Sequence, residues 1–343
     1  MSRPDPEAER RSLRARLAEA AEPPAAGLAA RLRRQPEPAA SEAQLAILDE
    51  LAKRALKRQS DLQAGLARVE AEADVLGKRL RRVESGLKAL LRLELEALSG
   101  RPADPLDLDA RRFSLLSQNE EDGYVLALLG HCGAPNRSFV ELGSGRTGGN
   151  SGLLAQTAGW RGLMVDANPE ATPVAAARFG LTGRVKVVTD FVTPDNVDRL
   201  IEEAGLAGEV DLFSLDIDSF DYWVLKAMTA CSPRLMILEY NDRFGPEARV
   251  TVPLGSQELS RRRHYFGVSL AALTALAGER GYRLVACDSA GTNGFFVRQD
   301  LAPALPTRRP EEVWRENPRR RGEPSGADFI AGLAADGLAL VEV

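Results

Sequence analysis

The sequence has 343 residues, of which 44% are hydrophobic and 27% are charged, and its formal net charge is −4. This length suits one large domain with an additional segment, and the slightly acidic balance argues against a general nucleic-acid-binding protein, which would be basic. The three cysteines are widely spaced, which argues against a disulfide framework or a zinc site, and no apolar run reaches the length of a membrane span. Because the N-terminus also lacks the apolar core of a signal peptide, we expect a cytoplasmic protein.

Composition divides the chain into five parts. Residues 1–40 are rich in Pro, Ala, Arg and Glu with few large apolar side chains, so we expect them to be disordered. Residues 41–98 contain no proline and predict one long helix, and residues 99–110, which begin with Ser-Gly-Arg-Pro, predict a linker. We expect the main domain over residues 111–300 and a Pro- and Arg-rich tail with a short helix or strand over residues 301–343.

The predicted helix carries a heptad pattern. Apolar or small residues recur at alternating spacings of four and three, namely Leu62, Leu66, Val69, Ala73, Leu76, Leu80, Val83, Leu87 and Leu90. This seam is typical of a coiled coil and predicts a homo-oligomer. An amphipathic helix that folds back on its own domain is the alternative. We favour the coiled coil because the helix is far longer than an ordinary one.

A glycine-rich stretch, SFVELGSGRTGGN, begins at Ser138. Residues 139–142 predict a buried strand that runs into a glycine turn and then a helix. The spacing Gly143-x-Gly145-x-x-Gly148 fits the dinucleotide fingerprint, because small residues let a nucleotide approach the backbone and a helix start offers free N–H groups. A tight strand–helix turn with no ligand is the alternative.

Four further strands follow, and an acidic residue stands at the end of each. They are residues 162–166 with Asp166, 185–191 with Asp190, 210–218 with Asp216 and Asp218, and 234–241 with Glu239 and Asn241. Helices fit between the strands, which predicts an α/β fold with a doubly wound, Rossmann-like parallel sheet. Two last strands, 283–287 and 294–298, predict a terminal antiparallel hairpin. Ligands bind at the carboxyl ends of such strands, where these acids cluster.

The expected ligand is S-adenosylmethionine or a nicotinamide dinucleotide. Asp166 follows the glycines by roughly 20 residues and suits either cofactor, because an acid there pairs with ribose hydroxyls. Glu141 directly precedes the glycine turn, as in the E/D-x-G-x-G pattern of methyltransferases, and Asp190 is placed to reach an adenine amino group. Together with the terminal hairpin, these features favour S-adenosylmethionine. Gln118, at the start of the preceding helix, is a further candidate cofactor residue.

Six motifs occur in one order along the chain: SQNEEDG, FVELGSGRTGGN, MVDANPE, SLDIDSFDYWVLKAM, EYN and GTNGFFVR. Through them, residues 112–300 resemble the FkbM-like family of class I S-adenosylmethionine-dependent methyltransferases. The resemblance implies methyl transfer to a hydroxyl, often of a sugar, with a sugar, glycan or nucleotide-sugar acceptor and a connection to polysaccharide biosynthesis. The chain departs from the family pattern at residues 119–120 and 219–220, at the expected rim of the site.

Methylation of a sugar hydroxyl needs a group that takes its proton or a metal that acidifies it. His264, in the loop after the fifth strand, is a candidate base, and Asp218 competes with it. Asp216, Glu239 and Asn241 offer three oxygen ligands from neighbouring strand ends, which suit Mg²⁺ or Ca²⁺. A carboxylate that acts directly on the acceptor is the alternative, so Asp216 is also a candidate for catalysis and for the cofactor site.

Two other functions stay open. Tyr222 and Lys226 have the Tyr-x-x-x-Lys spacing of a nicotinamide-dependent oxidoreductase or epimerase. A non-catalytic coiled-coil scaffold with a degenerate methyltransferase domain is the other.

The arginines of the second half are the last feature of note. Those at positions 261–263 could hold a substrate phosphate or form a solvated turn. We expect the later ones, at positions 308, 309 and 319–321, to be solvated.

Overall fold

The computed structural model describes residues 42–98, 108–256 and 264–343. The predicted disordered segment 1–40, most of the predicted linker 99–110 and the arginines at 261–263 lie outside the described residues. Contacts divide the chain into two compact units, Met1–Arg81 and Arg82–Val343, and each is described by itself.

The long helix α3 spans Glu42–Leu98, 57 residues without a proline. Its seam residues are exposed in the first unit, with exposed fractions of 68% for Leu62, 56% for Leu66 and 69% for Leu80. Ion pairs one turn apart, such as Lys53–Asp49 at 2.7 Å, lie on its polar surface. The helix therefore presents an apolar stripe, and its pairing as a coiled coil stays a prediction.

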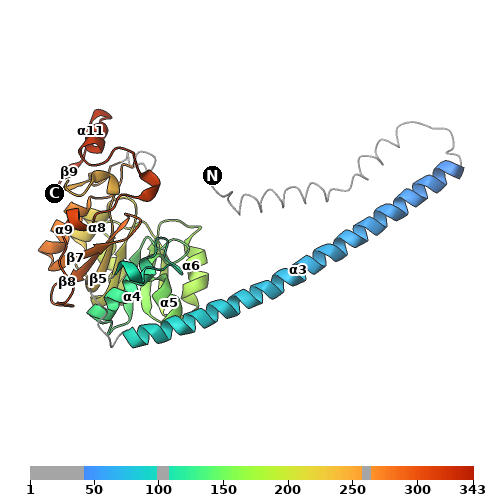
Figure 1. Cartoon of the computed structure of the whole chain (residues 1–343), viewed down its shortest axis with the longest axis horizontal. Helices are drawn as coiled ribbons and strands as arrows, with labels where there is room; N and C mark the ends of the chain where they lie inside the picture. The colour runs from blue at the N-terminus through green and yellow to red at the C-terminus, as the bar shows by residue number, and fades with distance from the viewer. Residues whose placement is uncertain (1–41, 99–107, 257–263) are drawn as a thin grey trace. The chain divides into compact units, whose positions relative to one another are not determined.

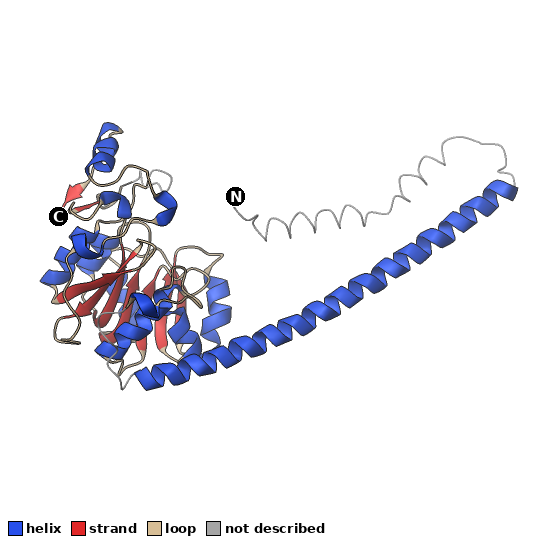
Figure 2. Cartoon of the chain, viewed as in Figure 1, coloured by secondary structure: helices blue, strands red, loops and turns tan. Residues whose placement is uncertain are grey.

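A seven-stranded sheet forms the centre of the second unit (Figures 1 and 2). Strand β1 pairs in parallel with both β2 and β4, so the strand order reverses between them. Strand β8 lies antiparallel between β5 and β7. Across the sheet the strands are β3 (Val185–Thr189), β2 (Arg161–Asp166), β1 (Ser138–Leu142), β4 (Gly208–Leu215), β5 (Cys231–Glu239), β8 (Asn293–Arg298) and β7 (Tyr282–Cys287). The mixed, Rossmann-like α/β sheet expected from the alternating pattern is confirmed.

Alternate strand residues face two separate cores, because successive side chains of a strand point to opposite sides of the sheet. Phe139 belongs to one core and Val140 to the other. The Phe139 core is covered by α4 (Glu121–Cys132), α5 (Gly152–Thr157) and α6 (Thr172–Phe179). The Val140 core is covered by α7 (Val197–Glu203), α8 (Asp221–Ala227) and α9 (Leu270–Glu279).

A small lobe lies beyond the carboxyl end of β5. It joins the segment after β5 to the C-terminal segment, through pairing of β6 (Val250–Thr251) with β9 (Val341–Glu342). Phe244, Tyr265 and Leu333 are buried in its core. Its other short elements are η4 (Asp242–Phe244), η6 (Pro318–Arg320) and α11 (Ala327–Ala335). The short helix α10 (Pro310–Val313) instead packs against the Val140 core. The Pro- and Arg-rich tail is thus packed against the segment that follows β5.

The remaining short helices are η1 (Asp109–Arg111), η2 (Gly149–Ser151) and η3 (Gly180–Thr182). None of the helices within the described ranges combines the length and the apolar character that crossing a bilayer requires.

Candidate functional site

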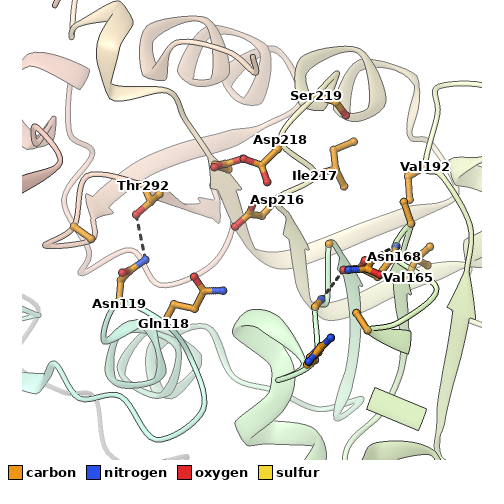
Figure 3. Close-up of a pocket in the computed structure, with 18 of the residues that line it drawn as sticks. Gln118, Asn119, Val165, Asn168, Val192, Asp216, Ile217, Asp218, Ser219 and Thr292 are labelled. Carbon is orange, nitrogen blue, oxygen red and sulfur yellow. Dashed lines mark hydrogen bonds between the residues drawn. The ribbon is translucent and has the colours of Figure 1, made fainter. Parts of the chain in front are cut away.

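One pocket of about 980 Å³ opens where the parallel strands end (Figure 3). Gly143, Asp166, Asp190, Asp216 and Glu239, which follow or end five different strands, all line it. They meet because the carboxyl ends of parallel strands share one edge of the sheet, and the pocket lies at the reversal between β1 and β4. A volume near the upper end of the usual range leaves room for a nucleoside cofactor and a second molecule.

The glycine turn lies directly against the end of β4. Gly143 has φ +93°, and a Cβ placed on it would be 1.6 Å from the backbone oxygen of Asp216. Gly145 also has positive φ, and its N–H donates to Oδ2 of Asp166 at 2.6 Å. The other oxygen, Oδ1, accepts from the N–H of Asn168 at 2.8 Å. The predicted cofactor residues Gly143, Gly145 and Asp166 are therefore one connected wall of the pocket.

Glu141 is buried behind the glycine turn and contacts the residues that follow it. Its side chain is fully buried, and its Oε2 accepts from the Ser151 hydroxyl at 2.5 Å. Burial raises its pKa to about 8, so the neutral acid prevails at neutral pH. A Cβ placed on Gly149 would lie 2.2 Å from Oε1 of Glu141. Glu141 does not line the pocket within the described residues, so any effect on a cofactor passes through the glycine turn.

Asp190 and Phe191 form the wall after β3. Phe191 lines the pocket although 52% of it is exposed, and its N–H donates to Oδ1 of Asp190 at 2.8 Å. Arg199 lies 3.4 Å from Oδ2 of Asp190. An exposed aromatic ring beside a pocket offers a flat apolar surface to a planar ligand. The sequence pattern identified Asp190 but not Phe191, because an aromatic residue that follows a strand can be either exposed or buried.

Three carboxylates gather on the opposite wall. Asp216, Asp218 and Glu239 each offer an oxygen within 4.8 Å of the others, and Figure 3 shows Asp216 and Asp218 side by side. Glu239 is 7% exposed, and its Oε2 has no hydrogen-bond partner among the described residues. Burial, and then the charges of Asp216 and Asp221, raise the pKa of Glu239 well above its usual range. Three clustered oxygens with one buried and unpartnered fit a hard cation such as Mg²⁺.

The turn that carries two of these carboxylates is shaped by Asp221. Its Oδ1 accepts from the N–H of Ile217 at 3.0 Å and its Oδ2 from that of Ser219 at 3.1 Å. The same turn holds Asp218 at φ +52°, a left-handed conformation that is strained for a residue with a Cβ. The motif that follows β4 thus directs Asp216 and Asp218 into one cavity.

Two candidate residues have other roles in the structure. The Asn241 amide donates to the carbonyls of His264 at 2.7 Å and Phe266 at 3.0 Å, while its oxygen accepts from the N–H of Arg243 at 3.0 Å. Asn241 therefore shapes the loop, and Asp218 stands in its place in the carboxylate group. His264 is not among the described residues that line the pocket, and its Nε2 is 3.5 Å from Glu323. Burial lowers its pKa.

The remaining walls come from distant parts of the chain. Gln118 lines the pocket as predicted for a cofactor residue, and Asn119 beside it donates to the Thr292 hydroxyl at 3.3 Å (Figure 3). The tail contributes residues 317–320, of which Arg319 and Arg320 were predicted to be solvated. Tyr222, in contrast, is 7% exposed and packed in the core, so the Tyr-x-x-x-Lys spacing does not place this hydroxyl at the pocket.

No family model matches the chain, and no curated protein matches it. Similar solved structures include an O-methyltransferase from Bacillus cereus in complex with SAH, with a TM-score of 0.35 and 22% identity over 60% of this chain and 88% of that one. A putative O-methyltransferase from Klebsiella pneumoniae gives 0.34 and 18% over 61% and 87%. The methyltransferase domain of bacterial CtHen1-C gives 0.34 and 15% over 52% and 97%.

Glu141→Gln tests the buried acid. The pKa of Glu141 is about 8 in the folded chain against an ordinary 4.5, so its stabilising contribution is complete below pH 4.5 and is lost as the pH rises through 8. The Gln variant can still accept from Ser151 and does not titrate. Between about pH 5 and about pH 8 we expect wild type to lose stability relative to the variant by on the order of a few kcal/mol, measured by urea unfolding. Exposed Glu170→Gln is the control, and parallel curves for Glu141→Gln and wild type would contradict the assignment.

Proposed function

We propose that this chain binds S-adenosylmethionine and transfers its methyl group to a hydroxyl of a sugar, glycan or glycosylated metabolite. The observation that carries the proposal is the pairing of two unlike walls in one pocket. One wall has the glycine turn joined to Asp166, with Asp190 and Phe191 beyond it. The other has the three carboxylates that follow β4 and end β5. The first suits a nucleoside, and the second suits a hydroxyl that must lose a proton.

The glycine turn, Asp166, Asp190 and Phe191 form the cofactor wall, and each part of it suits a different part of the cofactor. Asp166 keeps lone pairs for ribose hydroxyls while it accepts from the glycine turn. Asp190 would accept from an adenine amino group, and the neighbouring Phe191 ring would lie against the base. Gln118 and the glycine turn remain for the amino-acid end of the cofactor. When bound, S-adenosylmethionine supplies a methyl group on a positively charged sulfur, which a nearby hydroxyl oxygen can attack.

Asp216, Asp218 and Glu239 form the wall that faces the acceptor, here called the acceptor wall, and this wall supplies the base. Asp218 is half-buried in the pocket, and we assign it to take the acceptor proton as the oxygen bonds to the methyl group and S-adenosylhomocysteine leaves. His264 is the second candidate, although it does not line the described pocket. In the alternative that a metal takes part, Asp216, Asp218 and Glu239 would hold Mg²⁺, which would lower the pKa of an acceptor hydroxyl. A sugar acceptor is supported by the FkbM-like motifs, several of which line this pocket.

A nicotinamide-dependent oxidoreductase fits less well, because Tyr222 lies in the core rather than at the pocket. A non-catalytic scaffold would not need three carboxylates gathered in one pocket, because their mutual repulsion costs free energy without a ligand.

Calorimetric titration with S-adenosylhomocysteine, with NAD⁺ in parallel, tests the cofactor. We expect the homocysteine nucleoside alone to bind. Asp166→Ala should weaken its binding by about tenfold or more, because a charged hydrogen-bond acceptor for ribose is lost. Exposed Asp195→Ala lies outside the described pocket lining and is the matched control. Binding of NAD⁺ alone would overturn the proposal, and binding of neither would favour the scaffold.

Asp216→Ala tests the acceptor wall. We expect the variant to retain binding of S-adenosylhomocysteine, to lose Mg²⁺ binding and to lose methyl transfer in a screen of sugar and glycan acceptors. The reason is that Asp216 supplies one of the three clustered oxygens. Titration with Mg²⁺ gives a readout that needs no acceptor. Full activity of Asp216→Ala would show that the metal assignment is wrong.

We also propose that α3 joins copies of this chain through its seam. Leu62, Leu66 and Leu80 are exposed, and burying each of them against an identical seam would stabilise the assembly by about 1.5–3 kcal/mol. An a/d seam is self-complementary, which favours a second copy as the occupant.

Light scattering of the full-length protein after gel filtration tests the seam. We expect wild type at a multiple of the monomer mass and the double variant Leu66→Asp/Leu80→Asp at the monomer mass, because four charges cannot be buried in a dimer seam. Ala64→Asp/Ala67→Asp places the same charges on exposed positions outside the seam and should stay oligomeric. Equal masses for wild type and the seam variant would rule the seam out as the interface.

A further inference from the structure

A wall of the pocket comes from the C-terminal tail. Asn317, Pro318, Arg319 and Arg320 line the same cavity as Asp218 and Glu239. We infer that this tail segment, residues 315–326, recognises the acceptor, and that Arg319 and Arg320 select an acceptor that carries an oxyanion, a phosphate or a carboxylate. The inference rests on the proposed methyl transfer, because it concerns the second substrate of the same pocket.

The segment is held by three residues that closely follow β5. The Tyr240 hydroxyl donates to the carbonyl of Arg315 at 3.2 Å. Asp242 accepts from the N–H of Asn317 at 3.0 Å and from Nη1 of Arg320 at 2.7 Å. Arg243, 1% exposed, donates to the carbonyls of Arg320 and Pro324. The buried guanidinium of Arg243 and the buried carboxylate of Asp242 both bind this segment, so it forms a fixed wall of the pocket.

The other side of the segment packs against the hairpin turn between β7 and β8. A Cβ placed on Gly291 would lie 2.3 Å from the carbonyl oxygen of Arg315 and 2.9 Å from the nitrogen of Asn317. Ser289 and Thr292 of the same turn also line the pocket. The tail therefore closes the cavity between the end of β5 and the hairpin, on the side of the carboxylate group.

The two arginines differ in how they are held. Arg320 is fixed by Asp242, and its side chain is 23% exposed. It lines the same cavity as Glu239. Arg319 is exposed, and none of the described carboxylates pairs with it. Its guanidinium is thus available at the mouth of the pocket.

An oxyanion explains why cations stand at this wall. The pocket lining carries six carboxylates, Glu120, Asp166, Asp190, Asp216, Asp218 and Glu239, which would repel an anionic acceptor. A neutral sugar would gain little from two arginines, whereas a phosphate or carboxylate forms charge-assisted hydrogen bonds with them. The arginines would hold the anion at the mouth while a hydroxyl of the same molecule lies against Asp218.

Three probes that share one ring isolate the anion: glucose 1-phosphate, glucuronate and glucose. Each is titrated at fixed ionic strength into full-length protein saturated with S-adenosylhomocysteine. We expect at least one of the two anions to bind about tenfold or more tightly than glucose, and the stronger one identifies phosphate or carboxylate. Arg319→Ala should remove about tenfold of that preference, and Arg319→Lys should restore part of it.

Arg321→Ala is the matched control, since this exposed neighbour is outside the described pocket lining. It should leave anion binding unchanged, and an equal loss in both variants would show diffuse attraction instead of a site. Weaker binding of S-adenosylhomocysteine to Arg319→Ala would overturn the inference, because the arginine would then serve the cofactor carboxylate. Equal binding or no binding of all three probes to the saturated protein would also overturn it while the proposed function stands. Failure to bind S-adenosylhomocysteine at all would instead remove the proposed function.

Discussion

The contact between Gly143 and the backbone oxygen of Asp216 is the constraint on which the pocket depends. A side chain at position 143 would have to occupy space 1.6 Å from that oxygen, so the turn after β1 approaches the end of β4 only as glycine. The approach follows from the parallel pairing of β1 and β4, which puts both strand ends at one edge. It brings the glycine turn and the carboxylate group into one cavity, so that a cofactor and an acceptor can be neighbours.

Local patterns in the sequence were enough for the sheet. Apolar runs between helices predict strands, and acids at strand ends must converge in a parallel sheet, which is why Asp166, Asp190 and Asp216 share one pocket. Patterns were not enough for residues whose role depends on distant partners. Asn241 is at the expected strand end, but carbonyls more than 20 residues away take its amide. An exposed aromatic such as Phe191 is indistinguishable in sequence from a buried one.

The pocket lining combines clustered carboxylates with arginines. The pocket gathers carboxylates whose mutual repulsion and burial raise the pKa of Glu239, and the neutral form of Glu141 beneath the glycine turn adds no further charge. Three arginines of the lining oppose these charges: Arg146 comes from the glycine turn, and Arg319 and Arg320 come from the tail. Tyr240, Asp242 and Arg243 link the tail to the carboxylate group, because they follow the strand that ends in Glu239 and hold the segment that carries Arg319 and Arg320.

Because residues 315–326 follow the whole sheet in the chain, the parts of the pocket form in a fixed order during translation. All seven strands of the large sheet precede residue 299, so the sheet and the cofactor wall can form while residues 315–326 are still within the ribosome. At that stage the buried positions of Asp242 and Arg243 have no tail to contact. A nascent chain would thus present its nucleoside site before its acceptor site, and the second substrate could be held only after residues 315–326 had emerged and supplied the missing wall.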